Sequence, residues 1–195
     1  MAEQTSDRRG QLLEAAVRVF AAKGFRASRV GDIAVEAGVA HGLLYHYFNS
    51  KDEVLETIFR ETWSALVTDT RRVEVSEVSL REQLRRFAKI YLGSWLATPE
   101  LVRVLVREVA RSPEVGDRVD EIRELFQVLQ RMIEAARDRG EVRADVNAQV
   151  AAWAIYGALE EILTGWVHGQ LPGGEADVER AVGTVVDVAH LGLAA

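Results

Sequence analysis

The sequence predicts an all-α protein of nine helices, in which three helices form an N-terminal domain and six form a larger bundle. Apolar residues recur at helical spacing along nearly the whole chain of 195 residues, and strand patterns are nearly absent. Glycine and proline separate the helical segments. Hydrophobic residues make up 48% of the chain, which is enough for a substantial core.

The first three helices are marked by glycines and by one capping residue. An apolar stripe over residues 12–20 predicts a helix that ends just before Gly24, which suits the left-handed position after a helix. Ser28 is suited to cap a second, short helix that Gly38 stops. A third short helix is expected from Ala40 to Phe48.

The next helices begin at recognisable capping residues. Either Asn49 or Ser50 is expected to cap a long helix. Ser79 and Glu82 have the spacing of a capping box, which opens the following helix. Pro99 suits the first position of a further helix, because its missing N–H would have no partner there.

The last three helices complete the count. The segment Ser112-Pro113-Glu114 is expected to start an amphipathic helix that Gly140 stops. Residues 147–168 read as one helix, rich in small and apolar side chains. A loop at 171–174 separates it from a final helix at about 176–193.

Charge is distributed unevenly between the two predicted domains. Residues 1–51 contain seven Lys or Arg and five Asp or Glu, whereas residues 52–195 contain seventeen and twenty-five. The net charge of −6 therefore comes from an acidic body that carries a mildly basic N-terminal domain. This asymmetry suggests that only the N-terminal domain meets a polyanion.

Several classes of protein are excluded by composition. The chain has no cysteine, which excludes disulfides, thiolate catalysis and zinc sites built on cysteine. Its N-terminus has early acidic residues and no continuous apolar run, unlike a signal peptide. No segment reaches the ~18 apolar residues of a membrane-spanning helix. We therefore expect a soluble, cytoplasmic protein.

Residues 28–48 have the pattern of a helix-turn-helix motif, in which two short helices are joined by a tight turn containing Gly38. Leu44 and Phe48 are four residues apart and are expected to pack inward from the second helix. Hydroxyl, imidazole and small groups face outward, and they suit contact with phosphates and base edges in a major groove. The expected outward residues are Ala40, His41, Leu43, Tyr45, His46 and Tyr47. A small domain with an ordinary aromatic patch is the alternative interpretation.

Residues 10–55 resemble the DNA-binding domain of the TetR family of bacterial transcriptional regulators. The matching segments are LLEAAVRVFAAKGF and RVGDIAVEAGVAHGLLYHYFNSKDEVL, in that order. The length of the chain and the nine expected helices also suit the family. The resemblance implies a transcriptional repressor whose recognition helix is residues 40–48.

The resemblance also assigns roles within this helix. His41 and Leu43 are expected to read base edges, with Gly42 allowing close approach of the backbone. Leu43 cannot hydrogen-bond a base, so it would contact a thymine methyl group or only pack. Tyr45 and Tyr47 are expected to bind phosphates.

Residues that flank the recognition helix extend the implied DNA interface. Lys51 is expected to bind a phosphate, while Ser28 and Arg29 are candidates for a phosphate or a base, and a guanine contact would suit Arg29. His46 is left open between phosphate contact and packing. The complete implied set is Ser28, Arg29, Ala40, His41, Gly42, Leu43, Tyr45, His46, Tyr47 and Lys51.

Two copies of the chain are expected on DNA, because one short helix reads too few base pairs. A dimer would read a pseudo-palindrome whose half-sites lie roughly one turn (~34 Å) or a multiple apart. Residues 147–168 and 176–193 look apolar on more than one face, and the resemblance implies that they form a homodimer interface of four helices. A purely internal core is the alternative. The expected interface residues are Ala148, Ala151, Ala152, Ile155, Ala158, Leu159, Ile162, Val167, Ala181, Val182, Val185, Val186, Ala189 and Leu193.

The resemblance implies a small-molecule pocket inside the bundle, whose occupancy changes the affinity for DNA. Large apolar and aromatic side chains on inner helix faces are the candidates to line it, and plain core packing is the alternative for each. They are Phe59, Trp63, Leu66, Phe87, Tyr91, Trp95, Phe126, Leu129, Ile133 and Tyr156.

Two C-terminal segments carry a narrower resemblance, to the fatty-acid-degradation regulators of this family. They are LVREVARSPEVGDRVDEI at 105–122 and YGALEEILTGWVHGQ at 156–170. This resemblance implies that long-chain acyl-CoA is the effector that releases the repressor from its operator. A TetR-type repressor of an efflux or catabolic operon that responds to another small lipophilic ligand is the alternative. A third, less favoured interpretation is an acyl-CoA carrier that does not bind DNA.

Arginines are the candidates to hold the phosphates of acyl-CoA, since guanidinium groups suit phosphate well. One set, Arg103, Arg107 and Arg111, shares a helix face, and a second cluster is Arg81, Arg85 and Arg86. Solvated helix faces paired with nearby glutamates are the alternative for both sets. At least one of Glu160 and Glu161 is expected to need a polar partner, and Arg107 or Arg111 is a candidate.

Catalytic motifs are absent from the sequence. There is no phosphate-binding glycine loop, no G-x-S-x-G and no H-E-x-x-H. The four histidines, at positions 41, 46, 168 and 190, do not have the spacing of metal ligands. We therefore expect a regulator with no enzymatic activity, no metal and no cofactor other than its effector.

Overall fold

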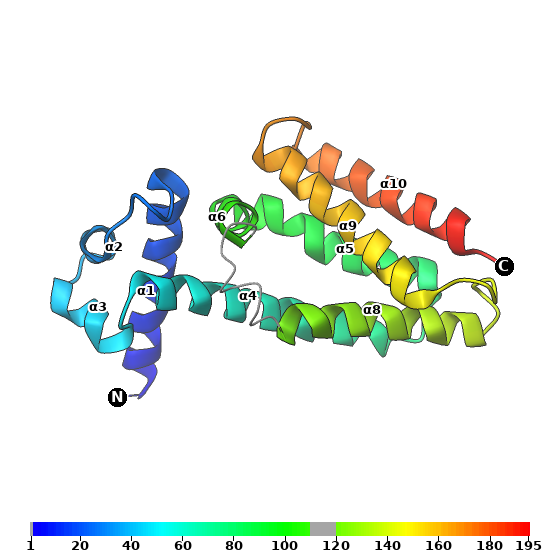
Figure 1. The fold of residues 1–195 in the computed structure, drawn as a ribbon, viewed down its shortest axis with the longest axis horizontal. Coiled ribbons are helices and arrows are strands. Elements are labelled where there is room, and N and C mark those ends of the chain that lie inside the picture. Colours follow the sequence, from blue (N-terminus) through cyan, green and yellow to red (C-terminus); the bar gives the residue numbers. More distant parts are fainter. Residues whose placement is uncertain (1, 110–119) are drawn as a thin grey trace. The chain divides into compact units, whose positions relative to one another are not determined.

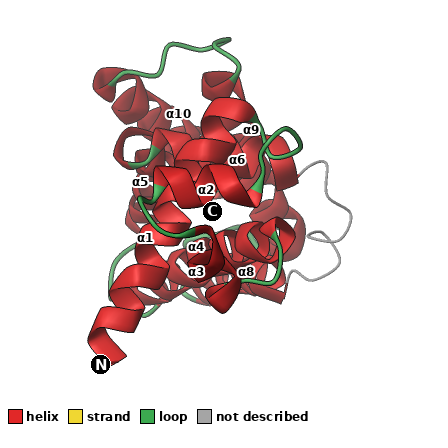
Figure 2. Cartoon of the chain, turned by 90° about the vertical axis from the view of Figure 1, so that its left-hand side faces the viewer, coloured by secondary structure: helices red, strands yellow, loops and turns green. Residues whose placement is uncertain are grey.

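The computed structural model describes the backbone of residues 2–109 and 120–195, and it is helical nearly throughout (Figure 1). Nine helices lie in these residues, connected by short loops and turns with no strand among them (Figure 2). An isolated antiparallel bridge joins Val142 to Ala194. The helices are α1 Ala2–Lys23, α2 Val30–Glu36, α3 His41–Tyr47, α4 Lys51–Glu74, α5 Leu80–Ala97, α6 Pro99–Val109, α8 Asp120–Asp138, α9 Ala148–Val167 and α10 Glu175–Leu193.

The helical residues form two compact units. Among the described residues, the N-terminal unit contains residues 2–62 and a segment that begins at Glu100, and the C-terminal unit contains residues 63–99 and 120–195. The division falls inside α4, between Thr62 and Trp63, so the first half of that helix belongs to the N-terminal unit. The domain boundary after Lys51 stays a prediction.

Helix ends in the N-terminal unit follow the glycines of the sequence. Gly24 and Gly38 have φ angles of 80° and 65°, a conformation that favours glycine, and they follow α1 and α2 as predicted. The expected cap of α2 is wrong, because α2 is capped at Arg29 instead of Ser28. The Asp32 carboxylate accepts the Arg29 backbone N–H at 2.8 Å, which ties the first turn together.

The start of α4 is fixed by both of the proposed capping residues. Ser50 Oγ accepts the backbone N–H of Glu53 at 3.1 Å. The Glu53 carboxylate in turn accepts the backbone N–H and the side-chain amide of Asn49, at 2.7 and 2.9 Å. These Asn49 donors stabilise the charged form and lower the pKa of Glu53.

The other predicted helix starts are confirmed where the structure describes them. Ser79 caps α5, Pro99 is the first residue of α6, and Asn147 caps α9 by accepting the Val150 N–H at 3.1 Å. Gly140, with φ of 78°, follows α8. The expected start of that helix at 112–114 lies outside the described residues.

The core of the N-terminal unit joins α1, α2, α3, the start of α4 and α6. Phe20, Ile33, Leu44 and Phe48 are each at most 2% exposed and belong to one apolar cluster. Val104 of α6 belongs to the same cluster, so α6 supports the helix-turn-helix although it follows that motif by more than fifty residues.

The C-terminal unit is a bundle in which α5 lies along α10 and α8 lies along α9 (Figure 1). Its interior is filled by fully buried side chains, among them Phe87, Leu92, Leu129 and Leu159. None of the described helices is both long and apolar enough to cross a bilayer.

Candidate nucleic-acid interface and effector site

The outer face of α3 presents the side chains that the helix-turn-helix interpretation requires. His41, Gly42, Tyr45 and His46 are exposed, while Leu43 and Tyr47 are half-buried. Leu44 is fully buried on the opposite face, so α3 has one anchored side and one polar and aromatic side. Both faces agree with the sequence prediction.

The backbone of α2 lies close to the His41 side chain. A Cβ atom at Gly31 would lie 3.4 Å from the Cδ2 and Nε2 atoms of His41, which is van der Waals contact. The His41 ring also contacts Tyr45, with the two ring centroids 5.4 Å apart. Sequence reasoning missed Gly31, whose only signal was a glycine in the first turn of an exposed short helix.

Lys51 makes three contacts that the sequence did not predict. Its ammonium group donates to the backbone carbonyls of Phe25, Arg26 and Ser28, at 2.8, 3.3 and 3.1 Å. It also lies 4.5 Å from the centroid of the Phe25 ring. An ammonium has three donors, and all three bind carbonyls here, while the predicted phosphate contact of Lys51 stays a prediction. Lys51 fastens α4 to the turn before α2.

Ser28 likewise faces inward. Its side chain is only 3% exposed, and its hydroxyl donates to the carbonyl of Gly24 at 2.7 Å. Ser28 therefore closes the turn between α1 and α2, and its expected phosphate or base contact stays a prediction.

Two arginines in the same turn remain suited to DNA. Arg26 and Arg29 are both exposed, and no ion pair joins either guanidinium among the residues whose side chains are described. Arg29 was predicted from its place before α2, whereas Arg26 was missed because it lies in an irregular turn. Both arginines lie shortly before α3 in the sequence.

The C-terminal unit gathers most of the aromatic residues predicted to line a pocket. The Trp63 ring lies 6.5 Å from that of Tyr91 and 6.2 Å from that of Tyr156. Phe87 contacts Tyr91 at 5.9 Å, and Phe126 contacts Tyr156 at 4.8 Å, both measured between ring centroids. Leu129 and Ile133 of α8 are also fully buried in this unit.

Other candidates for the pocket are placed elsewhere. Phe59, Arg103 and Arg107 belong to the N-terminal unit, and Arg111 lies outside the described residues. Trp95 has a separate role, because its indole N–H donates to the carbonyl of Gly173 at 2.9 Å.

The loop before α10 is held by two indoles. Trp166 donates to the carbonyl of Pro172 at 2.9 Å, next to the Gly173 carbonyl that Trp95 binds. The two indole rings lie 6.2 Å apart. A Cβ atom at Gly173 would come within 2.7 Å of Trp95 Nε1, so only glycine fits beneath the pair.

A polar cluster that the sequence did not predict lies inside the aromatic group. The Tyr91 hydroxyl donates to Glu160 Oε2, and the Tyr156 hydroxyl lies 3.2 Å from the Tyr91 oxygen and 3.4 Å from the same carboxylate oxygen. Burial, together with the Glu160 charge, raises the pKa of both tyrosines well above the usual range. Glu160 therefore does find a partner, but the described partners are tyrosines, whereas Glu161 is exposed.

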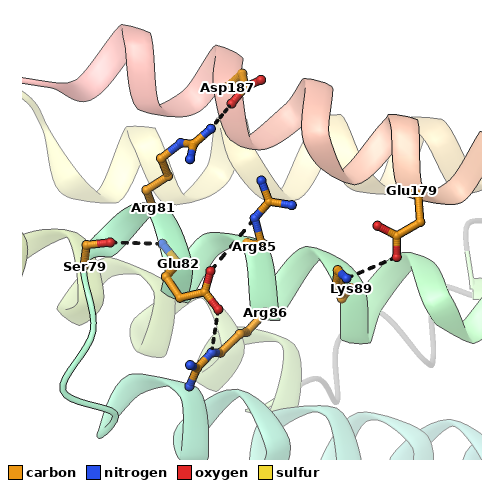
Figure 3. A network of polar contacts seen from close by, with 8 residues as sticks. All are labelled: Ser79, Arg81, Glu82, Arg85, Arg86, Lys89, Glu179 and Asp187. Carbon is orange, nitrogen blue, oxygen red and sulfur yellow. Dashed lines mark hydrogen bonds and ion pairs between the residues drawn. The ribbon is translucent and has the colours of Figure 1, made fainter.

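The second predicted arginine cluster is paired with carboxylates at the junction of α5 and α10 (Figure 3). Arg81 binds Asp187 of α10 at 2.6 Å. Arg86 and Arg85 both face Glu82, at 3.0 and 3.9 Å. The structure therefore favours the alternative interpretation of a solvated, ion-paired face, which contributes little stability because the groups are exposed.

The outer face of α9 and α10 carries an apolar groove. It has a volume of about 400 Å³. Its lining consists of Ala151, Ala154, Ile155, Ala158, Thr184, Val185, Val188, Ala189, Gly192 and Leu193. Beside it, Val150, Trp153 and Leu191 are 63%, 58% and 79% exposed.

The predicted dimer residues divide between this groove and the chain's own interior. Ala152, Leu159, Val182 and Val186 are each at most 1% exposed, so they pack within the unit and are not on its outer face. The division was not visible in the sequence, because α9 is apolar around most of its circumference.

Comparison with known proteins places both parts of the chain in one family. Residues 12–58 match the bacterial regulatory proteins of the tetR family, and residues 76–185 match the tetracyclin repressor-like C-terminal domain. The fatty acid metabolism regulator protein of Bacillus subtilis is 26% identical over 159 residues, 80% of this chain and 82% of that protein. The transcriptional repressor KstR2 of Rhodococcus jostii is 29% identical over 97% of this chain and 92% of its own length.

A solved structure shares the fold. The regulator FadR of Bacillus subtilis, solved in complex with stearoyl-CoA, superimposes with a TM-score of 0.84 over 93% of this chain and 97% of that one, at 23% identity. The α3 surface, the helical order and the two family matches agree: this chain is a member of the TetR family of DNA-binding transcriptional regulators.

Proposed function

We propose that this TetR-type repressor binds a palindromic operator as a homodimer and that long-chain acyl-CoA releases it, so that it controls genes of fatty-acid degradation. The observation that carries the DNA-binding part is the α3 helix, which buries Leu44 and exposes His41, Tyr45 and His46. A helix anchored on one side can enter a major groove with its other side.

The proposed contacts divide by chemistry. The start of α3 carries His41, Gly42 and Leu43, and Ala40 directly precedes it. At this position the side chains of a recognition helix reach base edges. Tyr45, His46 and Tyr47 follow in α3 and donate hydrogen bonds to phosphates. Arg29 and Arg26 also contact the DNA. Lys51 and Ser28 act indirectly, by holding the turn that carries both arginines.

The proposed dimer uses α9 and α10. Their outer groove, which includes the exposed Val188, and the exposed Leu191 of α10 give these helices an apolar outer face. Monomeric proteins rarely leave such a face in water, and a second copy of the same face would cover it with twofold symmetry.

The acyl-CoA part of the proposal is supported by the relatives and by the buried aromatic cluster. One relative is a fatty acid metabolism regulator, and the FadR structure contains stearoyl-CoA. The aromatic rings around Trp63 and Tyr91 offer an apolar environment for a long chain. The alternative effector is another small lipophilic compound, which the same aromatic environment would also accommodate.

The direct test is a mobility shift with DNA from upstream of the protein's own gene, with and without micromolar stearoyl-CoA. Release by stearoyl-CoA, and not by stearate or CoA alone, supports the full proposal. A complex that ignores stearoyl-CoA removes the acyl-CoA part and leaves the DNA-binding part.

Tyr45→Phe locates the contact on α3, because it removes one hydroxyl and leaves the helix intact. We expect a loss of operator affinity of about tenfold, in line with one hydrogen bond to a charged group. Val75→Ala, at an exposed residue after α4, is the control. Unchanged affinity in Tyr45→Phe would show that the hydroxyl does not bind phosphate.

A further inference from the structure

Glu160 carries a carboxylate within an aromatic interior, and the described residues give it no cationic partner. Its described hydrogen bonds come only from the hydroxyls of Tyr91 and Tyr156. The rings of Trp63 and Phe126 contact Tyr156, and Phe87 contacts Tyr91. Removing a carboxylate from water into such surroundings costs free energy, and an apolar residue would fill the same space without that cost. A carboxylate at this position therefore indicates a function.

This cluster has more hydrogen-bond acceptor sites than donor hydrogens. Each tyrosine hydroxyl has a single hydrogen, and both are required by Glu160 Oε2 or by the neighbouring hydroxyl. Glu160 Oε1 has no described partner. The raised pKa of both tyrosines keeps them protonated and neutral near pH 7. The cluster can therefore accept further hydrogen bonds, but it has no free hydrogen with which to donate one.

The cluster is also reachable. Tyr91 is 6% exposed, but Tyr156 and Glu160 are only half-buried in the described structure. A small polar group can therefore meet the carboxylate while an attached hydrocarbon lies against the aromatic rings.

We propose that Tyr91, Tyr156 and Glu160 bind a hydrogen-bond-donating group, a hydroxyl or an ammonium, that the effector carries beside its hydrocarbon chain. The inference rests on the proposed function, because it describes the effector that the C-terminal unit senses. It narrows the class of that effector: a group that only accepts hydrogen bonds, above all a carboxylate, would find no free hydrogen in the cluster and would be repelled by the Glu160 carboxylate.

The test compares ligands that share one chain and differ in the head group. Dodecylammonium, dodecanol and dodecanoate are titrated below their micellar concentrations, and binding is followed by tryptophan fluorescence, since Trp63 lies beside the cluster. We expect the ammonium and the alcohol to bind at least about tenfold more tightly than the carboxylate.

Two adjacent glutamates give a matched pair of variants. Glu160→Gln should reduce the preference for ammonium over carboxylate by about tenfold. Glu161→Gln removes the same charge from the exposed neighbouring position and should leave the preference unchanged. Tyr156→Phe is a second variant in case Glu160→Gln does not fold, and thermal unfolding checks each protein.

Equal binding of all three ligands, or equal effects of the two glutamine variants, would overturn the inference. The operator shift with stearoyl-CoA tests the proposed function independently of this inference. Release by stearoyl-CoA without a head-group preference rejects only the inference. A head-group preference without release by stearoyl-CoA rejects only acyl-CoA as the effector.

Discussion

Lys51, just after the recognition helix, binds the backbone of a turn in the same unit. Its three hydrogen bonds are all made to carbonyls of the 25–28 turn. The sequence placed it correctly, at the first residue of a helix after the recognition helix. Its role could not be predicted, because the carbonyls it binds belong to a turn twenty-three or more residues away in the chain.

The salt dependence of DNA binding distinguishes a side chain that contacts phosphate from one that only supports the 25–28 turn. Each phosphate contact that is lost lowers the slope of log K against log salt by about 0.9. We expect Arg29→Gln to lower the slope by about that amount, and Lys51→Met to weaken binding with no change of slope. A lowered slope in Lys51→Met would restore Lys51 as a phosphate ligand.

The buried tyrosines predict a response to alkaline pH. Burial raises the pKa of Tyr91 and Tyr156 in the folded protein. Their contribution to stability is therefore complete below the unfolded tyrosine pKa of about 10 and is lost as pH rises through the folded values. We expect part of the phenolate absorbance to appear only together with the loss of helical circular dichroism.

A variant with Tyr91→Phe and Tyr156→Phe provides the control for this titration. It should lose the part of the phenolate signal that is coupled to unfolding and keep the rest, which comes from Tyr45 and Tyr47. Complete ionisation of the unmodified protein before unfolding would contradict the burial argument.

At the scale of helices and loops, most starts and ends could be predicted because they depend on local chemistry. Gly24, Gly38 and Gly140 end helices where their positive φ angles are required. The cap of α2 was misassigned because Ser28 uses its hydroxyl for the carbonyl of Gly24, an arrangement that competes with capping.

The loop before α10 depends on contacts that no local pattern reveals. Trp95 and Trp166 are far apart in sequence, yet their indoles bind neighbouring carbonyls above Gly173. The sequence predicted Trp95 as a pocket residue, which stays a prediction, but it gave no sign of the bond between its indole and Gly173.

Gly173→Ala should destabilise the C-terminal unit by about 1–3 kcal/mol, the usual effect of overpacking. Its new Cβ would clash with the Trp95 indole that binds the same residue. Gly93→Ala is a matched control inside α5, where nothing lies within 4 Å of the added atom. That variant should be stabilised by about 0.5–1 kcal/mol. Chemical denaturation measures both, and equal effects would contradict the close packing of Gly173.

At the scale of the whole molecule, the helical count and order followed from periodicity, whereas the grouping of helices did not. Val104 of α6 belongs to the core of the N-terminal unit, although its sequence lies within the predicted larger domain. The outer and inner faces of α9 were also indistinguishable in sequence, since Ala152 and Ala154 differ in burial but not in residue type.

The exposed groove of α9 and α10 predicts the oligomeric state. Val188→Glu places a charge on the apolar face and should convert the protein to a monomer, measured by light scattering during size exclusion. The operator shift should be lost at concentrations that give a complex with the unmodified protein. Val75→Glu, at a position that is 79% exposed outside the groove, should remain dimeric. A dimeric Val188→Glu would place the interface elsewhere.

The Lys51 attachment has a mechanical consequence within the N-terminal unit. A primary ammonium donates in three directions at once, and all three donors of Lys51 bind carbonyls of the 25–28 turn. One side chain therefore links the first turn of α4 to three successive parts of that turn. When α4 is pulled along its axis, it must either carry the 25–28 turn with it or break three hydrogen bonds at once.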